Sequence, residues 1–346
     1  MALSFKSPTP KHRFDVEEEI KAVNRLFRRR KVPRSQKGRL LLATWNIANL
    51  GAQGRTDKAL QVIAHIMKRF DLICVQEVND HFKNFQQILA HMGTAFDYVM
   101  TDTAGNSERL AFVYRKVRTK PTRLFGELAL RPREYPKWTV KVRWRDTNKL
   151  PQVDVFKSHP FVPFDRNPYI GSFVAGNIDF VLANVHLYFG EFQDSKTREL
   201  REKYARRVLE IYTLAKWAGG ELKKRSTFDR DIILLGDMNV PSMDPQESTY
   251  KALVKFGWQP VDFVTRTGGS NLGNDKTYDQ MAFAPGSIGN RIVDYGVFDF
   301  DNEVFKPLWQ KLTANASEKK VVGLFNRHIK HHFSDHRPLW VQLETD

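Results

Sequence analysis

The segment that most constrains the fold is DIILLGDMNVP, residues 231–241. Four consecutive apolar residues, 232–235, follow a charged pair and lead directly into Gly236. A short run that is apolar at every position and bounded by glycine indicates a strand buried on both faces. Asp237 and Asn239 follow it two residues apart, so both can point to one side of the strand end. Unbound polar groups beside a core cost about 1–3 kcal/mol each. The segment therefore predicts either a ligand site or an ordinary turn, where Asp and Asn are common.

From Arg39 onward the chain predicts a layered α/β fold. Apolar runs indicate strands at 40–45 and 71–75, and helical spacing of apolar residues indicates helices at 57–70 and 82–92. Helices that alternate with strands in this way favour sheets covered by helices. Further strands are expected at 98–100, 110–114, 139–145, 168–174, 178–187, 278–283, 292–298 and 339–343, and further helices at 195–218 and 247–256.

Residues 1–38 are predicted to form a basic N-terminal arm, and residues 39–346 the main domain. We expect residues 1–14 to be a disordered tail. A short helix follows, capped by Asp15, and its apolar residues 20, 23, 26 and 27 form one stripe. This stripe predicts docking either on the domain or on a protein partner, and the sequence leaves both open.

The balance of charge predicts a polyanionic partner. Lys and Arg number 55 against 39 Asp and Glu, which gives a net charge of +16. The excess lies in residues 1–40 and 115–149. Within the second window, Lys141, Arg143 and Arg145 share one face of an alternating strand, where they are expected to bind substrate phosphates. The alternative is that these cations keep the edge of a sheet from pairing.

Cysteine usage and hydropathy predict the compartment. Cys74 is the single cysteine, which excludes an internal disulfide framework and fits a reducing compartment. No apolar run has the length of a signal-peptide core near the start or of a membrane span elsewhere. We therefore expect a cytoplasmic protein without membrane insertion.

Polar side chains lie at the ends of six of the expected strands. They are Asn46, Glu77, His186, Asp237, Asn239, Asp279, Asp335 and His336. If these strands share a sheet edge, the side chains form one pocket, in which crowded carboxylates need a neutralising cation. Carboxylate and amide oxygens suit Mg²⁺ or Mn²⁺. Three further histidines, at 328, 331 and 332, are expected in a surface loop and not at a structural zinc ion.

Six motifs in order resemble the endonuclease/exonuclease/phosphatase superfamily, whose fold is that of pancreatic-type deoxyribonuclease. They are TWNIANL (44–50), LICVQEV (72–78), NVHLYFG (184–190), LLGDMNVP (234–241), TYDQMAF (277–283) and SDHRPLW (334–340). The resemblance covers residues 40–343. It implies a four-layer α/β sandwich, in which two packed mixed β-sheets are flanked by helices, and hydrolysis of phosphoesters at one rim.

The resemblance also implies roles for individual residues around the metal. Glu77 matches the principal metal-binding carboxylate, Asn46 its neighbour at the metal, and Asp335 an aspartate near the metal. Asp237 matches the residue that orients or deprotonates the attacking water, and Asn239 one that holds the phosphate.

Two histidines match the pair that contacts phosphate and transfers protons, namely His186 and His336. Asp279 matches the carboxylate that sets the tautomer of His336. Arg166 resembles an arginine that contacts either the phosphate or the strand backbone. A Mg²⁺ ion at such a site would offset the charge that builds up in the transition state.

The resemblance leaves the substrate open. Residues 277–280 read TYDQ, whereas phosphoinositide phosphatases usually carry Trp-Cys-Asp-Arg, and the stretch is closer to the Tyr-Asp-Arg motif of the deoxyribonuclease branch. The resemblance therefore makes DNA the expected substrate and endonuclease the expected activity. The alternatives are a phosphomonoesterase, a phospholipid or phosphoinositide hydrolase, and an RNA-directed nuclease. A non-catalytic scaffold is the remaining alternative, and the intact set of polar residues argues against it.

Overall fold

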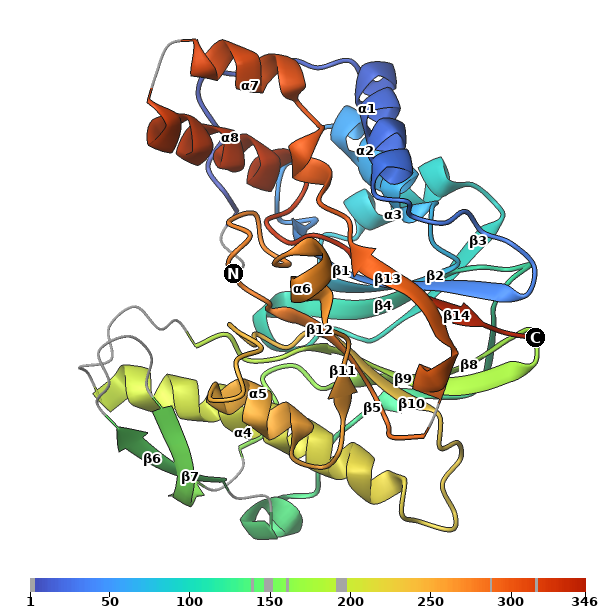
Figure 1. The fold of residues 1–346 in the computed structure, drawn as a ribbon, viewed down its shortest axis with the longest axis vertical. Helices are drawn as coiled ribbons and strands as arrows, with labels where there is room; N and C mark the ends of the chain where they lie inside the picture. The colour runs from blue at the N-terminus through green and yellow to red at the C-terminus, as the bar shows by residue number, and fades with distance from the viewer. Residues whose placement is uncertain are drawn as a thin grey trace.

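Two six-stranded mixed sheets packed face to face form the centre of the protein (Figure 1). The computed structural model describes residues 4–137, 140–145, 152–159, 162–190, 198–286, 288–314 and 317–346. The first sheet contains β1 (Arg39–Leu50), β2 (Leu72–Asn79), β3 (Phe96–Met100), β4 (Glu108–Arg115), β13 (Ile292–Val297) and β14 (Leu339–Glu344), in the order β13-β14-β1-β2-β4-β3. The second contains β5 (Lys120–Glu127), β8 (Tyr169–Ala175), β9 (Ile178–His186), β10 (Ile232–Asp237), β11 (Gln259–Pro260) and β12 (Asp279–Phe283), in the order β11-β12-β10-β9-β8-β5.

Helices cover the outer face of each sheet (Figure 1). On the first sheet lie α1 (Val16–Arg29), α2 (Asp57–Met67), α3 (Lys83–Met92), α7 (Lys306–Thr313) and α8 (Glu318–His332). On the second lie α4 (Arg198–Glu221) and α5 (Ser248–Val254), and the short α6 (Phe263–Thr267) packs beside β13. The predicted four-layer sandwich is confirmed. Among the described residues, no helix is both long and apolar enough to cross a membrane.

The continuous apolar runs arise because the central strands are buried on both faces. In β10, Ile232 and Leu234 face the helices of the second sheet, whereas Ile233 and Leu235 lie in the core between the sheets. β1 divides its residues in the same way between the helical layer and the inter-sheet core. A strand with apolar neighbours on both sides needs no polar face, so its sequence shows no alternation.

Strand directions bring the polar strand ends to one edge of the sandwich. β1 runs parallel to β2 in the first sheet, and β9 runs parallel to β10 in the second, so each pair ends at one edge of its own sheet, and the hydrogen bond from Asn46 to Asp237 joins these two edges. β4, β12 and β14 are antiparallel to their neighbours and therefore begin where the others end. Seven strands thus contribute their terminal residues to one rim.

The N-terminal segment is ordered, so the prediction of a disordered tail is wrong for residues 4–14. The segment is extended and lies against α8 and the turn before α7. The ring of Phe14 packs 4.9 Å from that of Phe305 and 5.6 Å from that of His332, and His12 packs 4.8 Å from Phe305. In an extended chain, residues two positions apart, such as His12 and Phe14, lie on the same face and can be buried together. Two residues are too few to distinguish this pattern from a polar tail in the sequence.

Helix α1 docks on the domain. Val23, Leu26 and Phe27 are buried in the core beside the first sheet, and Phe27 stacks on Phe298 at 4.2 Å. Arg30, which caps the helix, donates hydrogen bonds to Asp299. The apolar stripe is therefore covered by the chain itself, and the structure gives no support to a protein partner on it. The boundary at residue 38 stays a prediction.

The three histidines expected in a surface loop lie on helix α8, so that expectation is wrong. His328 is fully buried and His332 is 8% exposed. The segment was not recognised as a helix because its apolar face is completed by these imidazoles, which count as polar in any hydropathy pattern.

The strand with alternating cations forms a separate hairpin. β6 (Val140–Arg145) pairs with β7 (Gln152–His159), and the hairpin packs on α4 and α5. A register irregularity falls between Lys141 and Arg143. The structure describes only the backbone of Lys141, Arg143 and Arg145, so their predicted contact with phosphates lies outside the described side chains.

The buried histidines predict a loss of stability at acidic pH. Burial lowers the pKa of His328 to about 4 and that of His332 to about 3. Both are neutral in the folded protein, whereas the unfolded chain binds protons below its ordinary pKa of about 6.5. Their contribution to stability is therefore complete above pH 6.5 and lost as the pH falls toward 4.

We expect the drop in Tm between pH 8 and pH 5 to be smaller in His328→Leu than in wild type. The exposed His81→Leu variant is the control and should follow wild type; an unchanged drop in His328→Leu would contradict the prediction.

Candidate active site

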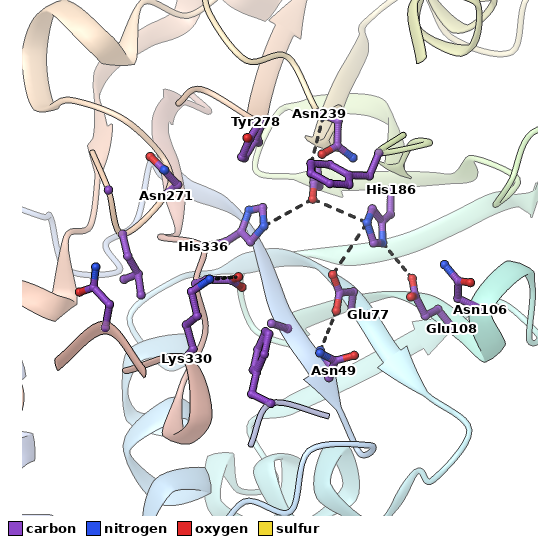
Figure 2. A pocket seen from close by; sticks show the side chains of 18 of the residues that line it. Asn49, Glu77, Asn106, Glu108, His186, Asn239, Asn271, Tyr278, Lys330 and His336 are labelled. Atoms are coloured by element: carbon purple, nitrogen blue, oxygen red, sulfur yellow. Dashed lines mark hydrogen bonds and ion pairs between the residues drawn. The ribbon is translucent and has the colours of Figure 1, made fainter. Parts of the chain in front are cut away.

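A cavity of about 690 Å³ opens at the rim where the strands meet (Figure 2). Its walls contain polar side chains from both sheets. The lining includes Asn49, Glu77, Asn106, Glu108, Arg166, His186, Asp237, Asn239, Asn271, Tyr278, Lys330, Asp335 and His336. Asn46 and Asp279 lie directly behind this wall and hydrogen bond to it.

The amide of Asn46 joins the two sheets at the floor of the site. Its Nδ2 donates to Glu77 Oε1 at 2.8 Å and to Asp237 Oδ2 at 3.0 Å. Glu77 belongs to the first sheet and Asp237 to the second. This double contact sets the orientation of the amide, because the opposite orientation would place its oxygen against two carboxylates.

Backbone geometry at the strand ends is specialised. Glu77 adopts a positive φ of 61°, which costs an ordinary residue roughly 1–2 kcal/mol, and its carboxylate accepts a hydrogen bond from Asn49 N at 2.7 Å. In the second sheet, Gly236 has a φ of 130°, and a Cβ there would lie 2.2 Å from Val185 O. Only glycine fits at this position, which explains the residue that precedes Asp237.

His186 is paired with a carboxylate that the sequence did not identify. Its Nδ1 lies 2.9 Å from Glu108 Oε2, and its Nε2 lies 3.8 Å from Glu77 Oε1 and 3.7 Å from Asp237 Oδ2. Burial lowers the pKa of His186, and so does the nearby Arg166, but the surrounding carboxylates outweigh both and raise it above its ordinary value. The carboxylates around His186 therefore favour its imidazolium form.

His336 repeats this arrangement on the other side of Asp237. Its Nδ1 lies 2.8 Å from Asp279 Oδ2, and its Nε2 lies 3.7 Å from Asp237 Oδ2. Burial opposes protonation, but Asp279 and Asp237 raise the pKa of His336 well above its ordinary value. Burial alone would raise the pKa of Asp237, and the two imidazoles together lower it. Asp237 thus lies between two imidazoles whose protonated forms are favoured by the carboxylates around them.

Two further predicted residues hold this arrangement in place. Asn239 donates from Nδ2 to Leu187 O at 2.8 Å and from its backbone N to Asp237 Oδ1 at 3.0 Å. Arg166 is 4% exposed and donates from Nε to His186 O at 2.8 Å. The guanidinium also lies 3.5 Å from Glu108. Arg166 lines the cavity, but its Nε and Nη2 donate to the carbonyls of His186 and Leu187, and its Nη1 lies 3.1 Å from Asp165.

A cation could bind at Glu77 and Asn46. With its amide nitrogen bound to two carboxylates, Asn46 has its Oδ1 buried and without a hydrogen-bond partner among the described residues. An unpaired amide oxygen beside a carboxylate is a donor set suited to a hard divalent ion. Asp335 lines the same cavity, and its carboxylate is paired with Lys330 at 3.1 Å.

A second cluster with the spacing of metal ligands consists of Asp237, Asp279 and His336, whose ligand atoms lie within 4.8 Å of one another. Here the imidazolium of His336 already neutralises both carboxylates. A divalent ion would have to displace that proton, so the donor set at Glu77 and Asn46 fits a cation better.

The structure brings together the site residues predicted on strand ends and adds several that were missed. Glu108 could have been found, because it is the first residue of a strand antiparallel to β2 and so begins at the edge where Glu77 lies. Ser334 Oγ donates to Asn46 O at 2.7 Å and thereby fixes the loop that carries His336. No sequence pattern indicates a serine contact of this kind.

The pairing of His186 predicts a measurable shift in its pKa. In Glu108→Gln the carboxylate is lost, while burial and Arg166 continue to disfavour the imidazolium. We expect the pKa of His186, followed by NMR titration of its imidazole without divalent cations, to fall below that of the wild type. The titration of His336 serves as the internal control. An unchanged pKa at His186 would show that Glu108 does not hold its proton.

Comparison with known proteins agrees with this geometry. A sequence profile of the Endonuclease/Exonuclease/phosphatase family matches residues 43–295. Deoxyribonuclease gamma of Mus musculus is 25% identical over 281 residues, which cover 75% of this chain and 76% of that protein. Two solved structures share the fold at a TM-score of 0.50: a mannosyl-6-phosphatase of Bacteroides thetaiotaomicron (15% identity, 87% of this chain and 98% of that one) and humanized D. rerio TDP2 (12% identity, 88% and 99%). The chain therefore belongs to the Endonuclease/Exonuclease/phosphatase family, whose members are hydrolases.

Proposed function

We propose that the protein is a divalent-metal-dependent phosphodiesterase that hydrolyses DNA as an endonuclease. The observation that carries the proposal is the position of Asp237, a buried carboxylate placed between the imidazoles of His186 and His336 and joined through Asn46 to Glu77. Carboxylates and cationic donors gathered in this way can hold a phosphate and activate water against it.

Each group has a defined task in this proposal. His186 and His336 each carry a proton on the nitrogen that faces Asp237, so both can donate to the non-bridging oxygens of a phosphate and protonate the leaving oxygen. Asp237, whose pKa is lowered, stays ionised and can orient the attacking water or accept its proton. Asn239, through its contacts to Leu187 and Asp237, keeps this carboxylate in place.

Glu77 and Asn46 would hold the metal ion, Mg²⁺ or Mn²⁺. When bound, the ion would offset the negative charge that develops on the phosphate. The buried Arg55 lies near Glu77 and Asp335, and burial lowers its pKa to about 10, so it remains protonated at neutral pH. Its positive charge thus stabilises the nearby carboxylates of Glu77 and Asp335 before any metal binds.

Nucleic acid is favoured as the substrate by the net charge of +16 and by the similarity to deoxyribonuclease gamma. The phosphatase among the structural neighbours shares the fold at 15% identity, which supports no choice of substrate. DNA therefore remains the first substrate to test, and a phosphomonoester, a phospholipid or RNA remain the alternatives.

Relaxation of supercoiled plasmid is the direct test. We expect wild type to nick plasmid with Mg²⁺ and not with EDTA. Glu77→Gln and His336→Ala should each lower the rate by about 10²–10³-fold, because each removes a group that acts on the developing charge. The matched control is Asp179→Asn, an exposed carboxylate on β9 at the end far from His186, which should keep the wild-type rate. Turnover of a phosphomonoester with intact plasmid would contradict the proposal.

Salt should weaken activity on DNA steeply. If about six phosphates are neutralised, affinity should fall about 10³-fold between 50 and 200 mM salt. The measurement is KM for plasmid as a function of salt, with a small soluble phosphodiester as the control substrate, whose hydrolysis should change little. A flat dependence for plasmid would exclude nucleic acid as the substrate class.

A further inference from the structure

We propose that Phe5, in the N-terminal segment, binds substrate by stacking on a nucleobase beside the scissile phosphate; the inference rests on the proposed action on nucleic acid. Phe5 precedes every motif of the family and lies outside the matched residues 43–295. Its side chain nevertheless lines the same cavity as Glu77 and His336.

The backbone of Phe5 is tied to the turn that positions Glu77. Phe5 N donates to Gln53 Oε1 at 2.7 Å, and Gln53 Nε2 donates to Phe5 O at 3.3 Å. Gln53 N in turn donates to Asn49 O at 2.8 Å, and Asn49 N donates to Glu77 Oε2 at 2.7 Å. Four hydrogen bonds therefore connect the backbone of Phe5 to the proposed metal ligand, and they fix the point at which its side chain leaves the main chain.

The remainder of the segment is anchored firmly enough to present this ring. Phe14 and His12 pack on Phe305, and Gln53 also contacts His331 of α8 at 2.6 Å. A ring that is already ordered loses little conformational freedom when a base stacks on it. The favourable energy of stacking is then available to substrate binding.

The neighbours of Phe5 favour a nucleotide over an apolar ligand. Lys330 Nζ lies 5.6 Å from the centre of the Phe5 ring, and the amides of Asn49 and Asn326 line the same cavity. An aromatic face beside a cation and amides suits a base with its phosphate, whereas a lipid chain needs a continuous apolar wall.

Aromatic groups lie on both sides of the catalytic residues. In Figure 2, Asn49 and Lys330 lie on one side of His336 and Glu77, and Tyr278 lies on the other. Tyr278 contacts Phe189, which is 43% exposed and also lines the cavity. A strand that passes its phosphate over the site would thus meet an aromatic ring on either side, and Phe5 supplies one of them.

The test measures binding without cleavage. A single-stranded tetranucleotide that contains 2-aminopurine is titrated with the full-length protein in EDTA, and fluorescence reports stacking. We expect Phe5→Ala to raise the Kd about 5–100-fold, because the stacking of one base is lost. Phe5→Trp keeps an aromatic ring and should bind as wild type does. The matched control is Phe228→Ala, which removes a 56% exposed phenyl ring from the loop before β10, away from the site, and should bind as wild type does.

A second oligonucleotide separates stacking from folding. A tetranucleotide with every base replaced by an abasic residue should bind wild type and Phe5→Ala equally, and the Tm of the two proteins should agree.

Equal binding of the 2-aminopurine strand by wild type and Phe5→Ala, with plasmid relaxation intact in wild type, would overturn the role of Phe5 and leave the proposed function standing. Loss of affinity for both strands would also overturn it, since that result indicates a structural role. A wild-type protein that neither binds nor relaxes DNA would overturn both.

Discussion

The hydrogen bonds from one amide nitrogen of Asn46 to Glu77 and Asp237 hold the site together. These carboxylates belong to different sheets, and without a donor between them they would repel each other across a medium of low polarity. The contact therefore does two things at once. It fixes how the edges of the two sheets meet, and it leaves the oxygen of the same amide free for a cation.

The charges around this contact alternate in space. Asp237 lies between His186 and His336, and each imidazole has a second carboxylate behind it, from Glu108 and Asp279. Buried charges are costly when isolated, but each group here has a neighbour of opposite sign. Proton positions at rest are consequently determined by geometry, and a bound phosphate would meet donors that are already oriented.

Much of this could be predicted from the sequence, for a physical reason. Buried strands such as β10 are continuous apolar runs that end abruptly in polar residues, so both the strand and its functional end are visible in the sequence. Parallel strands deliver those ends to a common edge, which is why Glu77, His186 and Asp237 could be expected to meet. The four-layer architecture follows from the same alternation of helices with apolar strands.

The features that were missed depend on contacts between distant segments. Glu108 is the first residue of β4, and recognising it required the antiparallel pairing of β4 with β2. His328 and His332 complete an apolar helix face although histidine is read as polar. The segment 4–14 becomes ordered only because α8 and Phe305 offer it a surface, and nothing local in its sequence records that surface.

The course of the N-terminal segment also affects how the protein should be handled. The two ends of the chain lie on different sides of the molecule (Figure 1). Thr345 is hydrogen bonded to Gly38, at the end of the sandwich where β1 begins, whereas residue 5 lines the cavity. A tag or fusion placed ahead of this segment would begin on the side of the molecule where the cavity lies, while one joined after the exposed Asp346 would begin at the end of the sandwich where β1 starts.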